Sequence, residues 1–229
     1  MNYTTENFEQ GQVLLIDKPL RWTSFDVIQR LRKITGIRKI GHAGTLDPLA
    51  TGLLIICTGK FTKRINEFMA QEKEYTGTFT VGATTTTYDL ESERENLKPF
   101  DYITAENIES ARVNFIGGIL QIPPAHSAIK IGGKRVYELA RQGKEVKLEP
   151  RKITIKEFEI TKIQLPLVYF RVVCSTGTYI RSLAFDFGGV LGCGAYLSSL
   201  CRTRIGEFTL EKALSVETFE KKVKENIIK

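Results

Sequence analysis

Histidine and cysteine are rare in this chain, and long apolar runs are missing. Its 229 residues include two histidines, His42 and His126, and four cysteines. The cysteines form no C-x-x-C pair and have no histidine at ligand spacing, which disfavours both a metal site and a disulfide framework. No stretch reaches the roughly 18 to 20 apolar residues of a membrane helix, and the polar, acidic start predicts no signal or transit peptide. We therefore expect a cytoplasmic protein with reduced thiols.

The charge balance is positive. Lysine and arginine total 33 against 26 aspartates and glutamates, so the formal net charge is +7 at pH 7. A surplus of this size fits a polyanionic partner, most commonly a phosphate backbone. Charge alone fits a basic protein without such a partner equally well. The 42% hydrophobic and 26% charged residues are ordinary for a globular enzyme and argue against disorder.

Apolar residues recur at spacings typical of strands and helices. Residues 13–16 and 53–57 are predicted to be buried strands, and alternation from Tyr75 onward predicts a half-buried strand. Ser24 is expected to cap a helix that ends at Gly36. Further elements are expected over residues 60–69, 104–115, 168–174, 180–191, 197–208 and 216–223. Because several strands follow one another in hairpin order, we expect an α+β fold, a mixed and mostly antiparallel sheet flanked by helices, in one domain over residues 1–229.

The segment over residues 121–151 differs from the rest in composition. It gathers basic residues around Gly132-Gly133 and one short predicted helix: Lys130, Lys134, Arg135, Arg141, Lys144, Lys147 and Arg151. A solvated basic loop is one interpretation. With the global charge, an insertion that grips RNA phosphates is favoured.

The loop over residues 41–52 displays one carboxylate just before a predicted buried strand. Its glycines permit backbone conformations closed to other residues, and Pro48 is expected to hold Asp47 in an extended conformation. Rigid presentation of one reactive group suits a nucleophile or a general base. Taken alone, the loop is better explained by a turn in which Asp47 caps its own backbone.

Several motifs, in order from Leu14 to Phe208, resemble the TruB family, the tRNA pseudouridine-55 synthases. The run Gly41 to Leu54, Gly-His-Ala-Gly-Thr-Leu-Asp-Pro-Leu-Ala-Thr-Gly-Leu-Leu, resembles the family signature and is long enough to be specific. The other matching motifs are Asp17-Lys18-Pro19 with Thr23-Ser24, Lys73-Glu74-Tyr75, Pro123 to Lys130 in a thumb-like insertion, Gly177 to Arg181, and Gly192 to Ala195.

The resemblance implies the pseudouridine synthase fold with an eight-stranded mixed sheet, and it implies no cofactor. The implied reaction isomerises uridine 55 in the T-loop of tRNA. The N1–C1′ bond breaks, and the uracil turns and rejoins through C5. The partner would be the tRNA stem-loop, with no membrane and no protein partner, and the protein would be a monomer.

The resemblance also implies catalytic roles. Asp47 matches the nucleophile, and Arg181 matches the arginine that keeps it ionised, because a nearby positive charge favours the charged carboxylate. Tyr75 matches a tyrosine that stacks on the extruded uracil and is a candidate for proton transfer. Taken alone, Tyr75 would be a core residue of its strand and Arg181 a surface arginine.

Substrate contacts are implied at five further positions. His42 matches a residue that stacks where the flipped base had been. Tyr179 and Leu200 match base-contacting positions. Lys18 is expected to support the site or a phosphate, and Lys130 lies in the basic insertion.

The chain departs from the family pattern in three places. Arg21-Trp22 stands where glycine is common, so that turn is expected to differ, and Cys201 replaces a second arginine. After the helix near residues 216–223 we expect no RNA-binding domain of the PUA type, which predicts weaker or more salt-sensitive tRNA binding.

Two alternatives to the enzyme remain. A non-catalytic tRNA-binding or folding module on the same scaffold would not need Asp47, Arg181 and Tyr75 together. A hydrolase using Asp47 as its base would need a second carboxylate or histidine.

Overall fold

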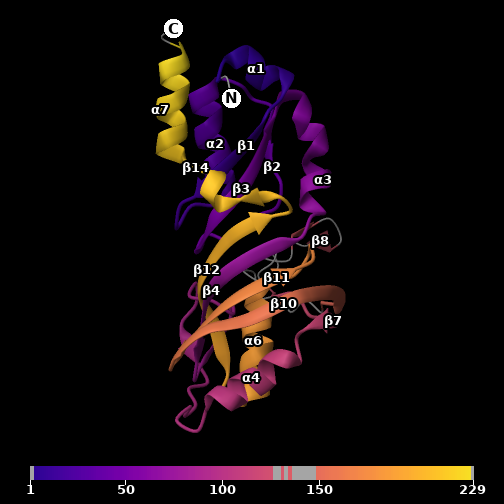
Figure 1. Cartoon of the computed structure of the whole chain (residues 1–229), viewed down its shortest axis with the longest axis vertical. Helices are drawn as coiled ribbons and strands as arrows, with labels where there is room; N and C mark the ends of the chain where they lie inside the picture. Colours follow the sequence, from indigo (N-terminus) through magenta and orange to yellow (C-terminus); the bar gives the residue numbers. More distant parts are fainter. Residues whose placement is uncertain (1–2, 126–129, 132–133, 136–147, 228–229) are drawn as a thin grey trace. The chain divides into compact units, whose positions relative to one another are not determined.

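A computed structural model describes residues 3–125, 130–131, 134–135 and 148–227 (Figure 1). The chain divides into two units, residues 1–76 with 200–229 and residues 77–199, and each is described by itself. The helices are α1 (Thr5–Gln10), α2 (Ser24–Thr35), the 3-10 helix η1 (Gly59–Arg64), α3 (Ile65–Met69), α4 (Ala105–Val113), α6 (Ile180–Leu191), the 3-10 helix η2 (Leu210–Lys212) and α7 (Val216–Ile227). The strands are β1 (Val13–Lys18), β2 (Ile40–His42), β3 (Ala50–Thr58), β4 (Lys73–Val81), β5 (Thr84–Thr85), β6 (Arg94–Glu95), β7 (Gly117–Gln121), β8 (Lys130–Ile131), β9 (Lys134–Arg135), β10 (Arg151–Gln164), β11 (Leu167–Cys174), β12 (Ala195–Ile205), β13 (Phe208–Thr209) and β14 (Leu214–Ser215).

Strand pairing gives a mixed sheet in the order β14-β1-β3-β12-β4-β11-β10-β7, with β2 paired to β3 and β13 paired to β12. Strand β1 pairs in parallel with β14, and β3 pairs in parallel with β12, whereas the pairs β1–β3 and β10–β11 are antiparallel. Two short hairpins, β5-β6 and β8-β9, lie off this sheet. The predicted α+β class, with a mixed sheet and flanking helices, is confirmed.

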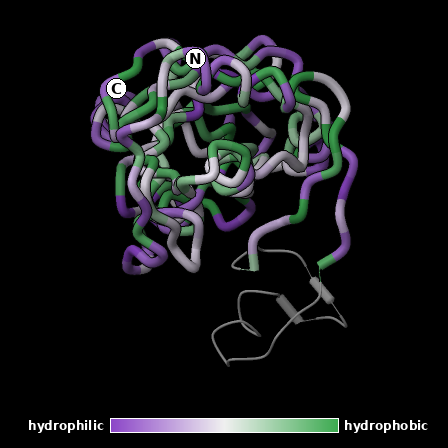
Figure 2. Tube along the Cα trace, turned by 90° about the horizontal axis from the view of Figure 1, so that it is seen from below, coloured by the Kyte–Doolittle hydropathy of each residue, from purple (hydrophilic) through white to green (hydrophobic). Residues whose placement is uncertain are grey.

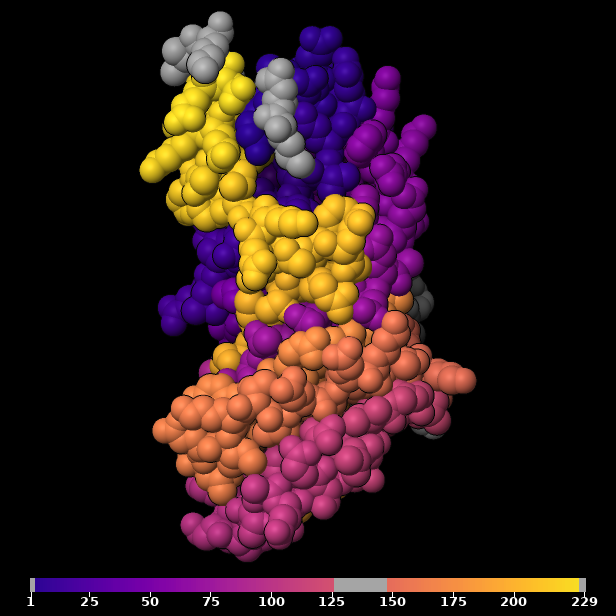
Figure 3. All heavy atoms as spheres, viewed as in Figure 1, coloured from indigo at the N-terminus to yellow at the C-terminus, as the bar shows by residue number. Residues whose placement is uncertain are grey.

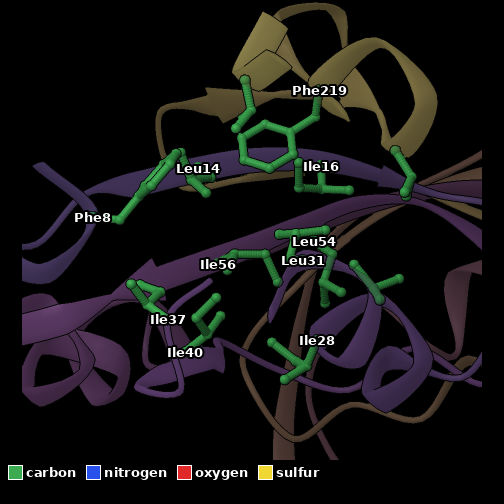
Figure 4. Close-up of a cluster of buried hydrophobic side chains, with 13 residues drawn as sticks. Phe8, Leu14, Ile16, Ile28, Leu31, Ile37, Ile40, Leu54, Ile56 and Phe219 are labelled. Atoms are coloured by element: carbon green, nitrogen blue, oxygen red, sulfur yellow. The ribbon is translucent and has the colours of Figure 1, made fainter. Parts of the chain in front are cut away.

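The first unit is built around β3, whose apolar run is buried along nearly its whole length. Strands with both faces covered lose the alternation of half-buried strands and become continuously apolar. Figure 4 shows one side of this core, where Phe219 of α7 points toward Leu14 and Ile16 of β1. Ile28 and Leu31 of α2 belong to the same cluster.

Helix α2 begins at a capping box. Thr23 is the N-cap: its hydroxyl accepts from the Asp26 amide at 3.0 Å, and the Asp26 carboxylate accepts from the Thr23 amide at 2.8 Å. The expected cap, Ser24, is therefore wrong by one position, and Ser24 is the first helical residue. Gly36 ends the helix with a left-handed φ of 75°, as expected.

The second unit is organised by aromatic packing. Phe79 of β4 stacks on Phe170 of β11 with ring centroids 4.2 Å apart, and Phe158 and Phe187 pack around them. Arg112 of α4 donates to the Phe158 carbonyl of β10 at 2.6 Å. In Figure 3, α4 and the β10–β11 hairpin form one continuous surface. The unit thus has an aromatic core with α4 tied to the hairpin.

Most predicted elements are present, with local differences. The single helix expected over residues 60–69 is divided into η1 and α3. Hydrophobic and hydrophilic segments are interspersed along the described part of the trace in Figure 2. Much of the basic segment 121–151 lies outside the described residues. That residues 1–229 form a single catalytic domain stays a prediction. Within the described ranges, no helix combines the length and apolar character needed to span a membrane.

Candidate active site

Asp47 occupies the first position of a tight turn that leads into β3. Its backbone carbonyl accepts from the Ala50 amide at 3.0 Å, and Pro48 occupies the second position, which suits its fixed φ. The Asp47 side chain is half-buried. Gly44 and Gly52, on either side of the turn, have φ values of 93° and 101°, which confirms the expected need for glycine there.

The serine at the start of α2 holds the residue before Asp47. Ser24 Oγ accepts from the Leu46 amide at 2.9 Å and donates to the Leu46 carbonyl at 3.2 Å. Both residues are buried, so a single hydroxyl satisfies two backbone groups that water does not reach. This explains why Ser24 does not cap its helix.

Lys18 lies fully buried at the end of β1 beneath the same turn. Its ammonium group donates to three backbone carbonyls, those of Pro19 at 3.0 Å, Trp22 at 2.6 Å and Pro48 at 3.4 Å. Burial lowers the pKa of Lys18 to about 8, although the negative charge of Asp47 opposes the shift. Lys18 therefore supports the Asp47 turn from inside the protein.

Arg202 fixes the other side of the loop. Its guanidinium is buried and donates to three carbonyls, those of Leu53 at 2.8 Å, Gly44 at 3.2 Å and Thr45 at 3.5 Å. A side chain at Gly52 would place its Cβ 2.4 Å from the Arg202 carbonyl, so only glycine allows β3 and β12 to approach here. Arg202 was not predicted from the sequence, because β12 has a mixed composition with a second arginine, Arg204, two positions later.

His42 precedes the Asp47 turn on β2, where it pairs with Ile56 of β3. Burial lowers the pKa of its imidazole, and the charge of Arg202 lowers it further, while the Gly44 backbone opposes the shift. The ring is therefore neutral near pH 7. A neutral, half-buried aromatic ring is suited to stacking.

Leu200 and Tyr75 lie in the same unit as Asp47. Leu200 of β12 pairs with Ala50 of β3, three residues beyond Asp47, and its carbonyl accepts from the Thr51 hydroxyl at 3.4 Å. Tyr75 is 8% exposed on β4. The neighbouring Glu74 accepts from the Thr203 hydroxyl of β12 at 2.8 Å, so β4 is held beside β12 at this level.

Arg181 lies in the first turn of α6, as expected, in the second unit. Its Nη1 donates to the Thr87 carbonyl at 3.2 Å, and its Nε lies 3.7 Å from the Asp89 carboxylate. Both charged side chains are 5% exposed. Asp89 in turn accepts from the Thr87 hydroxyl at 2.5 Å and from the Glu91 amide at 2.9 Å. The sequence reasoning missed Asp89, because no pattern links it to a residue 92 positions away.

The segment that contacts Arg181 carries a strained residue. Tyr88, between Thr87 and Asp89, has a φ of 64°. Its ring stacks on Phe185, one turn after Arg181 on α6, with centroids 4.1 Å apart and an interplanar angle of 20°. The stack thus joins this segment to α6 next to the Arg181–Asp89 pair.

Tyr179 is the N-cap residue of α6 and has no side-chain cap of its own. The buried side-chain amide of Gln121, at the end of β7, binds the backbone of this N-cap residue instead. Its Oε1 accepts from the Tyr179 amide at 2.8 Å, and its Nε2 donates to the Tyr179 carbonyl at 3.1 Å. The start of α6 is therefore fixed to the edge of the basic segment.

The predicted site residues fall into two groups. The first unit holds Lys18, His42, Asp47, Tyr75 and Leu200. Tyr179 and Arg181 belong to the second unit, and the pairing of Arg181 with Asp47 stays a prediction. The backbone of Lys130 lies in β8, and its side chain lies outside the described residues. In the part of the chain that is described, no three His, Cys, Asp or Glu side chains converge on a common metal position.

The comparisons of this sequence with known proteins agree on one family. A family model described as TruB family pseudouridylate synthase (N terminal domain) matches residues 32–180. A tRNA pseudouridine synthase B from Flavobacterium johnsoniae is 54% identical over 224 residues, covering 95% of this chain and 98% of that protein. One from Phocaeicola vulgatus is 53% identical over 219 residues and covers 93% of each chain.

Two solved structures have folds similar to that of this chain. A chain of a Cbf5-Nop10-Gar1 complex has a TM-score of 0.74 and 29% identity, covering 94% of this chain and 55% of its own length. A chain of an H/ACA RNP bound to a substrate RNA containing 2'-deoxyuridine has a TM-score of 0.71 and 27% identity, covering 94% of this chain and 54% of its own length. This chain therefore spans about half the length of these structural neighbours.

Proposed function

The chain belongs to the TruB family of pseudouridylate synthases, and we propose that it is a tRNA pseudouridine synthase that isomerises uridine 55 in the T-loop, with Asp47 as nucleophile. The observation that carries this proposal is the support of the Asp47 turn. The side chains of Ser24, Lys18 and Arg202 hold backbone groups on both sides of Asp47. A nucleophile needs such fixed presentation, whereas a surface turn does not.

The reaction balances within the nucleotide. Asp47 attacks the nucleotide and the N1–C1′ bond breaks. The uracil turns, C5 forms the new bond to C1′, and the bond between Asp47 and the nucleotide breaks, which frees the carboxylate for the next cycle. The proton on C5 is then lost and N1 gains a proton, so the composition is unchanged and no oxidant or reductant enters.

The remaining site residues have distinct roles in this proposal. Arg181 supplies the positive charge that keeps the Asp47 carboxylate ionised, and Asp89 orients its guanidinium. Tyr75 stacks on the uracil and is the candidate for transfer of the C5 proton.

The target uridine must leave its stack before it can react, because its C1′ and C5 atoms are not accessible inside a folded loop. His42, as a neutral ring, stacks in the space that the base has left. Tyr179 and Leu200 contact the extruded base, and Lys130 contributes to phosphate binding. The net charge of +7 favours binding of the tRNA backbone.

The substrate assignment is tested with a T-loop stem-loop RNA and a matched RNA in which only the target uridine is replaced by cytidine. We expect pseudouridine at the target position of the first RNA and at no position of the second. Binding of both RNAs without any turnover would favour a non-catalytic tRNA-folding module. Pseudouridine formed at other uridines would contradict the T-loop assignment.

A further inference from the structure

Arg21 adopts a backbone conformation that suits its residue type poorly. Its φ is 67°, in the left-handed region. Within the described residues, the other non-glycine residues with positive φ are Tyr88 and Asn96. Asparagine tolerates this region and Tyr88 is held by its stack on Phe185, but an arginine gains nothing there from its own backbone.

The contacts of the neighbouring backbone explain the conformation. The carbonyls of Pro19 and Trp22, on either side of Arg21, both accept from the Lys18 ammonium group. The Arg21 amide donates to the Pro48 carbonyl at 2.8 Å. The segment therefore curls around Lys18 and joins the turn immediately after Asp47, and glycine would satisfy this geometry with least strain.

The Arg21 side chain does nothing for the fold that would offset the strain. It is exposed, and in the described part of the chain its guanidinium takes part in no hydrogen bond or ion pair. Its neighbour Leu20 is also 54% exposed. The strained backbone at Arg21 thus presents an unpaired guanidinium to solvent. The same residue is hydrogen-bonded through its amide to Pro48, which follows Asp47.

We propose that Arg21 is an RNA-binding residue that binds the phosphodiester next to the target uridine. The position beside the Asp47 turn indicates which phosphate is bound, because the target nucleotide must lie over Asp47. A guanidinium binds two phosphate oxygens through paired N–H groups, which fixes the nucleotide as well as attracting it. This role rests on the proposed function and adds a substrate contact to the same site.

Three substitutions separate the charge of Arg21 from its strain. Arg21→Gly removes both, Arg21→Ala removes the charge and keeps the strain, and Arg21→Lys keeps the charge. Lys221→Ala is the matched control, because it removes an exposed cation from α7. All are measured for melting temperature and for affinity to a T-loop stem-loop RNA across a salt series, in an Asp47→Asn background that prevents turnover.

We expect Arg21→Gly to melt no lower than the parent while its Kd rises about tenfold and its salt dependence falls by about one counterion. Arg21→Ala should lose the same affinity but melt lower than Arg21→Gly. Arg21→Lys should keep the salt dependence, and Lys221→Ala should keep the affinity. With Asp47 restored, Arg21→Gly should raise KM more than it lowers kcat.

Equal affinity and salt dependence in Arg21→Gly and Lys221→Ala would overturn the role of Arg21. So would an affinity loss in Arg21→Gly that is explained by a lower melting temperature. Wild-type protein that binds the RNA but never converts it would contradict the proposed function and leave the Arg21 comparison valid. A parent protein with no measurable affinity for the RNA would overturn both.

Discussion

The hydroxyl of Ser24 binds both backbone polar groups of Leu46, accepting from its amide at 2.9 Å and donating to its carbonyl at 3.2 Å. These two hydrogen bonds connect the first turn of α2 to the residue before Asp47. The position of the carboxylate therefore depends on a helix that begins more than twenty residues earlier in the chain.

Replacing Ser24 by alanine should reduce kcat more than it reduces stability. The substitution leaves a buried amide and a buried carbonyl without their partner, which costs roughly 1–3 kcal/mol. Thr23→Ala is the control, because it removes the N-cap for about 1 kcal/mol without touching Leu46. Under conditions in which the two variants have the same free energy of unfolding, Ser24→Ala should have a lower kcat than Thr23→Ala. Equal kcat in the two variants would show that the Leu46 contact does not position Asp47.

Activity should fall as the pH rises through about 8, because Lys18 then loses its proton. The ammonium has three N–H donors for its three carbonyl partners, whereas the neutral amine has two, so one carbonyl around the Asp47 turn loses its hydrogen bond. Stability should change in the opposite direction. Between pH 8 and 10.5 the unfolded chain keeps the Lys18 proton, at its ordinary pKa of 10.5, whereas the folded protein has lost it at a pKa of about 8. The free energy of unfolding therefore rises with pH over this range.

The measurement is kcat against pH for wild type and Lys18→Met. The variant should be less active at neutral pH and should lack the decline near pH 8. A decline of the same midpoint in both proteins would assign it to another group.

His42 should act through its ring face and not through a proton. Because burial and the charge of Arg202 lower its pKa, the imidazole is neutral at pH 7. His42→Phe should therefore retain most of the wild-type kcat/KM, while His42→Ala should lose about tenfold, since stacking contributes roughly 1–3 kcal/mol per base. Steady-state kinetics on the stem-loop RNA distinguish the two. If phenylalanine is as damaging as alanine, the imidazole nitrogens are needed and stacking is not the main role.

Asp89→Asn should slow catalysis without weakening RNA binding. The asparagine keeps the shape of the side chain but removes the charge that faces the Arg181 guanidinium at 3.7 Å, so the arginine loses part of its orientation. We expect kcat to fall by at least about tenfold, equivalent to about 1.4 kcal/mol of transition-state stabilisation, with Kd within about twofold of wild type. Glu93→Gln, an exposed carboxylate nearby, is the control. A loss confined to Kd would make Asp89 an RNA contact instead.

Local periodicity was enough to predict most of the elements that carry the site, although β2, which holds His42, was expected to be part of a loop. β1, β3, β4 and α6 follow from apolar runs, alternation and helix-ending glycines, which act within a few residues. β10 was missed because its pairing with β11 shifts register between Ile155 and Glu157 and again between Ile160 and Lys162. Each irregularity interrupts the two-residue period that identifies a strand.

The contacts that support Asp47 could not be predicted in the same way. Thr23 and Ser24 are both good caps, and only the distant Leu46 backbone explains which of them is used. The three carbonyls around Lys18 and the three around Arg202 are backbone groups, which leave no residue-specific pattern in a sequence. The resemblance to the family supplied the residue roles, but the supporting contacts came from the structure.

The central claim, that Asp47 is the nucleophile, is tested most directly by single-turnover conversion of a T-loop stem-loop RNA by wild type and Asp47→Asn. Both proteins are used at concentrations that saturate the RNA, and binding is measured separately. If this claim is correct, wild type converts the RNA completely and Asp47→Asn forms no pseudouridine, at closely similar RNA affinity. Conversion by Asp47→Asn at a rate comparable to wild type would contradict it.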